Sequence, residues 1–106
     1  MKVVHNRYIP FGRNFLAVNI FGVIFSKAKL SRVNLNHEYI HTLQQREMLF
    51  VFFYLWYVLE YLVRLLQCRS FMKAYYLISF EREAYMNQKN LAYKQIRRHY
   101  DWIHYL

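Results

Sequence analysis

Residues that bend or break the backbone are scarce in this chain. Its 106 residues include two glycines and one proline, well below the ordinary usage of about 7% and 5%. This scarcity favours helices over a turn-rich β fold. Because 57% of the residues are hydrophobic, the chain also carries too much apolar surface to remain disordered. We expect one small, mostly helical α+β domain covering residues 1–106.

Cysteine and acidic residues are also scarce. The single cysteine, Cys68, cannot form an internal disulfide, so the sequence gives no sign of an oxidising compartment. Six acidic residues against fifteen lysines and arginines leave a net charge of +9, which favours an anionic membrane surface or nucleic acid as a partner. Without a recognised binding motif, nucleic acid is the weaker prediction. The first residues lack the apolar run of a secretory signal, so we expect a cytoplasmic or membrane-associated protein.

Two β-prone runs stand at the start of the chain. Residues 3–9 and 14–25 are rich in β-branched and aromatic residues, and Pro10-Phe11-Gly12-Arg13 between them predicts a turn. We expect a small β element in the form of a hairpin, followed by three or four helices. Gly22, inside the second run, marks a bulge or a close approach of the backbone.

The chemistry of the chain is concentrated in an H-E-x-x-H sequence, residues 37–41. Ser31 is a suitable N-cap for a helix that runs to about Met48 and contains it. Two histidines four residues apart lie on one helical face, so His37 and His41 can bind one zinc ion. Glu38 lies about 100° further round, where it can reach a metal-bound water without binding the metal. Gln44 and Gln45 are assigned to the solvated face of this helix.

A zinc hydrolase uses three protein ligands and leaves a fourth position for water, so a third ligand must come from elsewhere. Glu47 lies almost three turns beyond His37 on the same helix, so its side chain cannot fold back onto the site. Glu60 has a partner in Arg64, four residues later. The other candidates are His5, His99, His104, Glu81, Glu83 and Asp101.

The carboxylates of residues 80–85, FEREAY, are the strongest of these candidates, because they stand on a separate helix for which Ser79 is the predicted N-cap. Glu81 shares its helical face with the small Ala84, as close packing against another helix requires. We therefore prefer Glu81 as the third ligand and keep Glu83 as the alternative.

Residues 48–66 form a long apolar run in which only Glu60 and Arg64 are charged. Its length suits a transmembrane helix, but this helix also has a polar stripe that would have to be hidden from lipid. The stripe consists of Tyr54, Tyr57, Tyr61, Arg64 and Cys68. Three interpretations of this run stay open: a core helix, an interfacial helix and a membrane span.

Residues 91–106 predict a basic amphipathic helix, with an apolar face of Tyr93, Ile96, Tyr100 and Ile103.

The sequence HEYIHTLQ, with FEREA beginning at Phe80, resembles the gluzincin zinc metallopeptidases over roughly residues 31–90. It looks closest to their very small bacterial members. The resemblance implies a zincin-like active-site helix, zinc bound by His37, His41 and Glu81, and Glu38 as the general base. One position departs from the pattern. The family's aspartate four residues after the ligand glutamate, which steadies a zinc-bound histidine, is Tyr85 here, so another group must supply that contact.

The predicted function is zinc-dependent hydrolysis of a peptide or protein substrate. An edge strand within residues 14–25 would hold the extended peptide, and His99, His104 or a tyrosine would donate to the oxyanion. The alternative is a catalytically inactive scaffold stabilised by zinc, or a membrane-associated binding module.

Overall fold

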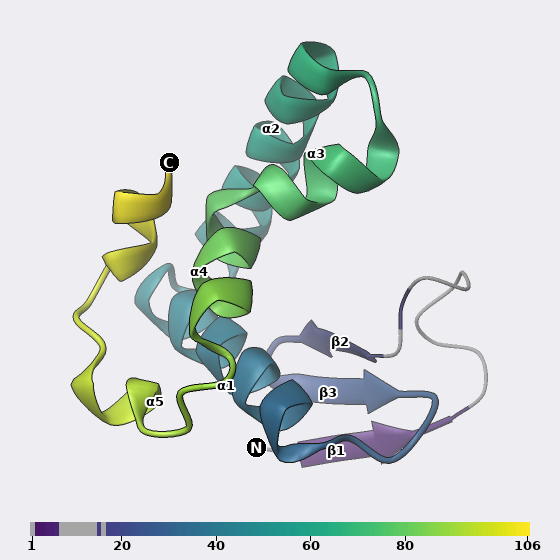
Figure 1. Ribbon diagram of the computed structural model, residues 1–106, viewed down its shortest axis with the longest axis vertical. Coiled ribbons are helices and arrows are strands. Elements are labelled where there is room, and N and C mark those ends of the chain that lie inside the picture. The colour runs from purple at the N-terminus through teal and green to yellow at the C-terminus, as the bar shows by residue number, and fades with distance from the viewer. Residues whose placement is uncertain (1, 7–14, 16) are drawn as a thin grey trace.

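The computed structural model describes residues 2–6, 15 and 17–106 (Figure 1). A three-stranded sheet at the N-terminus is followed by helices, which confirms the expected α+β class. The strands are β1 (Lys2–His5), β2 (Ala17–Ile20) and β3 (Val23–Ser26). Within the described residues five α-helices follow, with a terminal 3-10 turn η1 (Asp101–Tyr105). They are α1 (Arg32–Glu47), α2 (Val51–Cys68), α3 (Phe71–Leu77), α4 (Ser79–Asn87) and α5 (Tyr93–Ile96).

The sheet differs from the expected hairpin between residues 3–9 and 14–25. Its strand order is β1-β3-β2, with β1 parallel to β3 and β2 antiparallel to β3. The hairpin lies inside the second run, where Phe21 and Gly22 both have positive φ, 51° and 84°. Two such residues form the primed turn that matches the twist of a hairpin. Gly22 is therefore a turn residue, and the turn predicted at residues 10–13 lies outside the described residues.

Helix α1 is the element that joins the sheet to the other helices. The Ser31 side chain accepts a hydrogen bond from the amide of Asn34 at 3.1 Å, which confirms the predicted N-cap. Asn19 of β2 donates to the backbone oxygen of Glu38 at 2.8 Å. The buried face of α1 is mostly polar, an arrangement that costs free energy unless each group is hydrogen-bonded or has a functional role.

Gln44 and Gln45 belong to this buried face and are 0% and 1% exposed, so their assignment to a solvated face was wrong. The reason is tertiary: Gln45 bonds the β2–β3 hairpin through Asn19 and Gly22, and Gln44 bonds α4. A polar side chain on a helix gives no sign in the sequence that it will be buried with partners.

Helix α2 begins after a tight turn in which Leu49 and Phe50 have positive φ. It presents its polar stripe to the protein. The Glu60 carboxylate, 6% exposed, accepts from the amide of Ser79 at 2.8 Å and from its hydroxyl at 2.6 Å. Glu60 therefore occupies the N-terminus of α4, where Ile78 is the N-cap in place of the predicted Ser79. The apolar core beside it consists of Phe53, Ile78, Phe80 and Trp102, with Met48, Tyr54, Tyr57 and Tyr61 against it.

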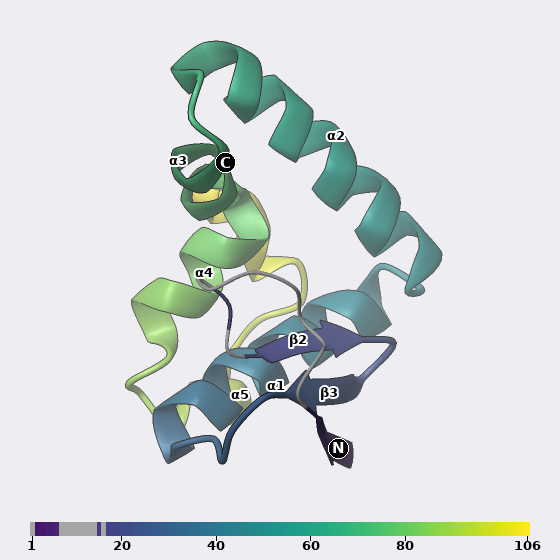
Figure 2. The same ribbon diagram turned by 90° about the vertical axis from the view of Figure 1, so that its right-hand side faces the viewer.

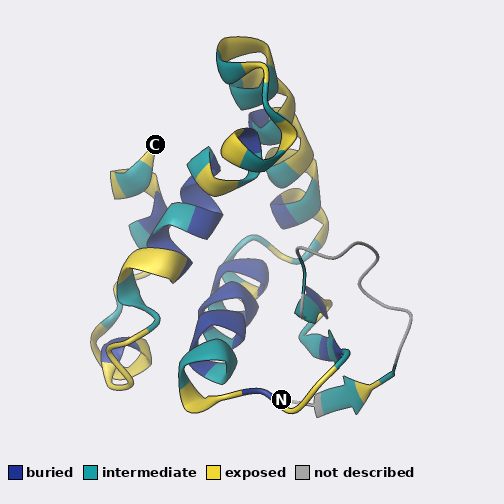
Figure 3. Cartoon of the chain, turned by 45° about the vertical axis from the view of Figure 1, so that its right-hand side comes forward, coloured by how far each residue is buried: buried dark blue, intermediate teal, exposed yellow. Residues whose placement is uncertain are grey.

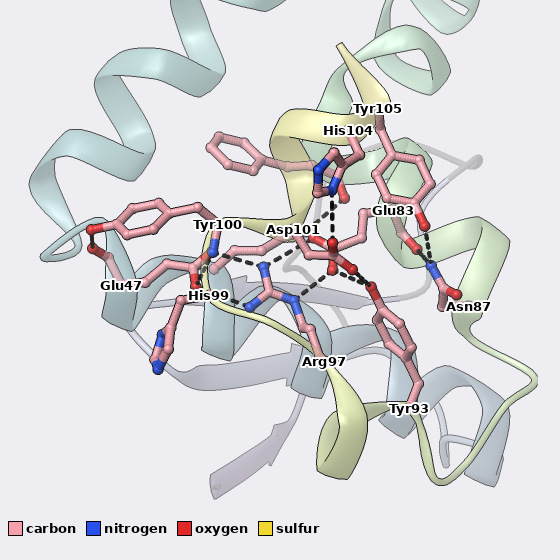
Figure 4. A network of polar contacts seen from close by, with 12 residues as sticks. Glu47, Glu83, Asn87, Tyr93, Arg97, His99, Tyr100, Asp101, His104 and Tyr105 are labelled. Atoms are coloured by element: carbon pink, nitrogen blue, oxygen red, sulfur yellow. Dashed lines mark hydrogen bonds and ion pairs between the residues drawn. The ribbon is translucent and has the colours of Figure 1, made fainter.

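The tail beyond α4 is not the amphipathic helix expected over residues 91–106. Only Tyr93 of its predicted apolar face is buried, and Ile96 is 68% exposed. Arg97 has an extended backbone, and its side chain pairs with both Glu47 and Glu83. This ion pairing fixes the tail against α1 and α4 in a broken path, shown in Figure 4, and Trp102 supplies the buried apolar group.

Candidate metal centre

Three donor atoms from two helices meet at the centre of the fold. His37 and His41 come from α1, and Glu81 comes from the first turn of α4. Nε2 of His41 lies 3.1 Å from Nε2 of His37 and 2.9 Å from Oε1 of Glu81. The distance from Nε2 of His37 to Oε1 of Glu81 is 3.3 Å, so the three atoms form a small triangle. All three residues are buried. Figure 3 shows the dark blue, buried residues along α1 and in α4.

This triangle has the size of a metal site. Ligands at about 2.0–2.1 Å from a tetrahedral zinc are separated from one another by about 3.3 Å. The three donor atoms could therefore hold a metal ion with little movement of their side chains. The sequence-based preference for Glu81 agrees with this placement.

Each imidazole is oriented by a glutamine through its other nitrogen. Nδ1 of His41 lies 2.8 Å from Oε1 of Gln44, and Nδ1 of His37 lies 2.8 Å from Oε1 of Gln88. An amide oxygen can only accept, so both Nδ1 atoms carry the proton when the imidazoles are neutral. Both Nε2 atoms then present lone pairs to the centre, which is the tautomer that a metal requires.

Gln88 supplies the contact to His37 for which the sequence indicated no carboxylate at position 85. The residue at that position, Tyr85, packs its ring against His37 with 4.4 Å between the centroids. Gln88 lies seven residues after Glu81, two helical turns along the same face, so its side chain can reach His37. That spacing was visible in the sequence, but a lone glutamine at the end of a helix is too common to single out.

The second oxygen of Glu81 is also held. The Tyr57 hydroxyl of α2 donates to Oε2 of Glu81 at 2.7 Å. Burial and the Glu81 carboxylate raise the pKa of Tyr57 well above its ordinary value, so the hydroxyl keeps its proton and donates. Tyr57, which the sequence indicated only as part of a polar stripe, fixes the carboxylate from the side of α2.

The charges of the cluster stabilise one another. Burial alone lowers the pKa of His41, but the charge and hydrogen bond of Glu81 and the charge of Glu38 outweigh it and raise that pKa to about 9. Burial raises the pKa of Glu81, yet the two histidines hold it well below its usual range. In the protein without metal, a protonated His41 therefore pairs with an ionised Glu81.

Glu38 is the exception in this otherwise satisfied cluster. It is 7% exposed, and its Oε2 has no hydrogen-bond partner among the described residues. Burial raises the pKa of Glu38 above its ordinary value, although His41 and His37 oppose this shift. A buried carboxylate oxygen without a partner is costly, and such an oxygen is suited to a group that takes up a proton during catalysis.

Two cavities meet at Glu38. The larger has a volume of about 330 Å³ and reaches from β2 to α2 and α3. The smaller, about 140 Å³, lies on the side of His37 and Gln88. Both are lined by Phe15, Ala17, Glu38 and Tyr75, and the rings of Phe15 and Tyr75 contact each other at 5.2 Å between centroids. The larger cavity is mostly apolar, with Val18, Phe53, Tyr54 and Tyr57 in its wall.

The other predicted ligand candidates lie elsewhere. Glu83 is fully buried outside the donor cluster and pairs with Arg97, while Tyr93 donates to it at 2.7 Å (Figure 4). Glu47 also pairs with Arg97. His99 is exposed, and Nδ1 of His104 lies 2.8 Å from Asp101. Neither of these histidines lines the described cavities, and His5 is exposed at the end of β1.

Comparison of the chain with protein-family models, with curated proteins and with solved structures gives no match. The site is therefore interpreted from its own geometry: a buried group of two imidazoles and a carboxylate, oriented from outside, with a carboxylate and two cavities beside it.

Proposed function

We propose that this chain is a zinc-dependent peptidase. The observation that carries the proposal is the orientation of the two imidazoles, because Gln44 and Gln88 leave both Nε2 lone pairs pointing at the Glu81 oxygen. In the metal-free protein a proton on Nε2 of His41 occupies the space between these atoms, and a metal ion bound there would take its place. Two histidines and one glutamate are the ligand set of several catalytic zinc sites.

The residues around the donors have distinct tasks in this proposal. Bound at His37, His41 and Glu81, zinc supplies a Lewis acid that polarises a carbonyl and lowers the pKa of water. Glu38 is the general base: its unpartnered Oε2 takes a proton from the attacking water and later gives it to the leaving amine. Its raised pKa suits this exchange, since a catalytic base works best near the ambient pH.

We assign the hydrogen-bond donor for the oxyanion to a pair of tyrosines, Tyr75 and Tyr85. Tyr75 lines both cavities beside Glu38, and its hydroxyl lies 3.1 Å from that of Tyr85. Burial raises the pKa of Tyr75, so the hydroxyl keeps the proton that an oxyanion needs. The distant His99 and His104 are not suited to this task.

The expected substrate is an extended peptide. β2 is an edge strand of the sheet, and Ala17, Val18 and Asn19 line the larger cavity. A peptide paired with this edge would place alternate side chains toward the cavity. Because its wall is mainly apolar and aromatic, we expect a preference for a large apolar side chain next to the cleaved bond.

Two measurements test the proposal. Purified protein should contain zinc at near-equimolar occupancy, and it should cleave a library of unlabelled peptides in a manner that a chelator abolishes. Glu38→Gln keeps the size of the side chain and should lose cleavage by a factor of roughly 10²–10⁴ while zinc occupancy is retained. Gln95→Ala, at an exposed position away from the cleft, is the control. Unchanged cleavage in Glu38→Gln contradicts the assigned base.

The second candidate is a catalytically inactive protein in which zinc stabilises the fold. The burial of all three donors favours it, because a metal ion bound there would join α1 to α4 and so contribute to folding. It predicts zinc binding without cleavage and a large loss of stability on chelation. The chelation melt and the peptide library together separate the two candidates.

A further inference from the structure

Helix α2 has an apolar face that is mostly exposed; Trp56 at its edge contacts the ring of Trp102, with 5.6 Å between the centroids. Nine large apolar side chains of this helix are exposed, and the most exposed, Leu66, is 81% accessible. At 100° per residue the nine positions cover an arc of about 160°. No polar residue of α2 falls inside that arc. We call this surface, from Val51 to Leu66, the α2 face.

The position of α2 leaves this face open to a flat partner. Figure 2 shows α2 along one outer edge of the molecule, with the other helices on a single side of it. The α2 face extends for about 22 Å along the helix axis. Among described residues, only Phe53 and Glu60 of α2 are buried, and the outward side of this helix does not contribute to the core.

The polar stripe that argued against contact with lipid is directed into the protein. Glu60 is held by Ser79 and Arg64, and Tyr54 and Tyr57 pack on the apolar core. Arg64 itself is 21% exposed at its side chain. Hydrogen bonds and packing within the fold offset the free energy of burying these groups, and the outward face of α2 is free of polar groups.

The charge on the surface is almost entirely positive. All six acidic residues lie in the described part of the chain, and none has a side chain more than 20% exposed; Asp101 has the largest value. Three exposed cations flank α2: Arg46 before it, Arg69 directly after it and Lys73 near the start of α3. With the acids inside, the net charge of +9 is presented to the surroundings.

We propose that the α2 face docks in the plane of an anionic lipid bilayer. An apolar helix face flanked by cations inserts into the boundary between headgroups and acyl chains, while the cations attract acidic headgroups. A second copy of this chain would also carry a net charge of +9, and the repulsion between the two chains disfavours self-association. Nucleic acid would leave the apolar face uncovered.

Docking in this manner places the candidate metal centre beside the bilayer. Tyr54 and Tyr57 lie on the inward side of α2 and line the larger cavity, so one helix would contact lipid on one side and the cavity on the other. This proposal does not depend on the proposed peptidase activity, and it is tested without measuring cleavage.

The test is flotation of the purified full chain with vesicles. Wild-type protein should float with phosphatidylcholine vesicles that contain roughly 30% phosphatidylglycerol, and more weakly with phosphatidylcholine alone. Leu55→Glu/Leu59→Glu should lower the partition coefficient roughly tenfold or more. Met86→Glu/Ile96→Glu adds the same charge at side chains that are 73% and 68% exposed elsewhere, and it should stay within about twofold of wild type.

A measurement on the wild-type protein covers the case in which the α2 variant fails to fold. Trp56 lies at the rim of the α2 face and is 36% exposed, whereas Trp102 is buried. Brominated lipids should therefore quench part of the tryptophan fluorescence. Absence of both flotation and quenching overturns the proposal, as does equal binding by the two double variants.

Two further outcomes identify a different occupant of the face. A dimer in sedimentation velocity that Leu55→Glu/Leu59→Glu dissociates would show that a second copy covers it. Retention of the cellular protein in membranes after alkaline carbonate extraction would show a spanning helix. By length and composition alone, α2 is long and apolar enough to cross a membrane. Either result overturns docking in the plane of the bilayer, and release by carbonate supports it.

Discussion

The side chain of Gln44 connects His41 to Glu83. Its Oε1 lies 2.8 Å from Nδ1 of His41, and its Nε2 donates to Oε1 of Glu83 at 2.8 Å. Glu83 in turn pairs with Arg97. The orientation of one imidazole of the candidate metal centre is thus linked, through a single amide, to the ion pairs that hold the tail of the chain.

Gln44→Ala removes the acceptor that fixes the tautomer of His41. We expect zinc affinity to fall roughly 10–100-fold, the usual effect of losing such a contact. Gln88→Ala should act similarly through His37. A competition titration with a chromophoric chelator measures both, and Gln95→Ala at an exposed position is the control. Equal affinity in all three variants would contradict the role assigned to the glutamines.

Glu81→Gln and Glu83→Gln separate two buried carboxylates only two residues apart. Glu81→Gln should lower zinc affinity sharply, because a neutral amide is a poor zinc ligand. Glu83→Gln should leave zinc bound but destabilise the fold, since it breaks a buried ion pair with Arg97. Zinc occupancy and urea denaturation, measured on each variant, check the distinction. Loss of zinc from Glu83→Gln alone would reverse the assignment.

Arg97→Met should destabilise the protein by about 3–5 kcal/mol, the cost of leaving a buried charge unpaired. Both Glu47 and Glu83 lose their cation, and the side chains of the three residues are at most 4% exposed. Chemical denaturation measures the change in the free energy of unfolding. Arg98→Met, at the exposed neighbouring position, should be close to neutral.

Zinc binding should release about one proton at neutral pH. In the metal-free protein the pKa of His41 is raised from 6.5 to about 9, so this residue enters the reaction protonated and must lose its proton to bind metal. Calorimetry in buffers of different ionisation enthalpy counts the proton. A binding enthalpy that does not change with the buffer would contradict the expectation.

The same pair sets the pH range in which the metal-free fold is most stable. His41 has a raised pKa, so its contribution is fully present below pH 6.5 and is lost as the pH rises through about 9. Glu81 has a lowered pKa, so its contribution is present above pH 4.5 and is lost on acidification through its folded-state pKa. Thermal melts of chelated protein across pH should therefore show falling stability on both sides of that range.

Gly22→Ala tests the hairpin that replaced the predicted one. The φ of Gly22 is +84°, and an added Cβ would lie 3.8 Å from Cγ2 of Thr42, which is an ordinary contact. The cost should therefore come from the backbone, about 1–2 kcal/mol. Gly22→Asn, which tolerates left-handed φ better, should cost less. Equal destabilisation by the two variants would point to side-chain crowding instead.

Helix α1 was predictable because its determinants are local. Ser31 as the N-cap, the absence of helix breakers before Met48 and the spacing of His37 and His41 all act within a few turns of one another. The preference for Glu81 over Glu83 followed from the small Ala84 on the same face. Local signals therefore predicted the α+β class and favoured His37, His41 and Glu81 as the residues that would meet.

What surrounds those residues was decided by tertiary contacts. Gln44 lies in α1, Tyr57 in α2 and Gln88 directly after α4, and only packing shows which atom each one contacts. The tail was mispredicted for the same reason, since the two ion pairs of Arg97 outweigh an amphipathic pattern. The sequence alone indicated that His37, His41 and Glu81 would meet, with Glu83 as the alternative. The tertiary structure decided the tautomers of the two histidines, the unpartnered oxygen of Glu38 and the outward face of α2, because burial and long-range hydrogen bonds have no local signal.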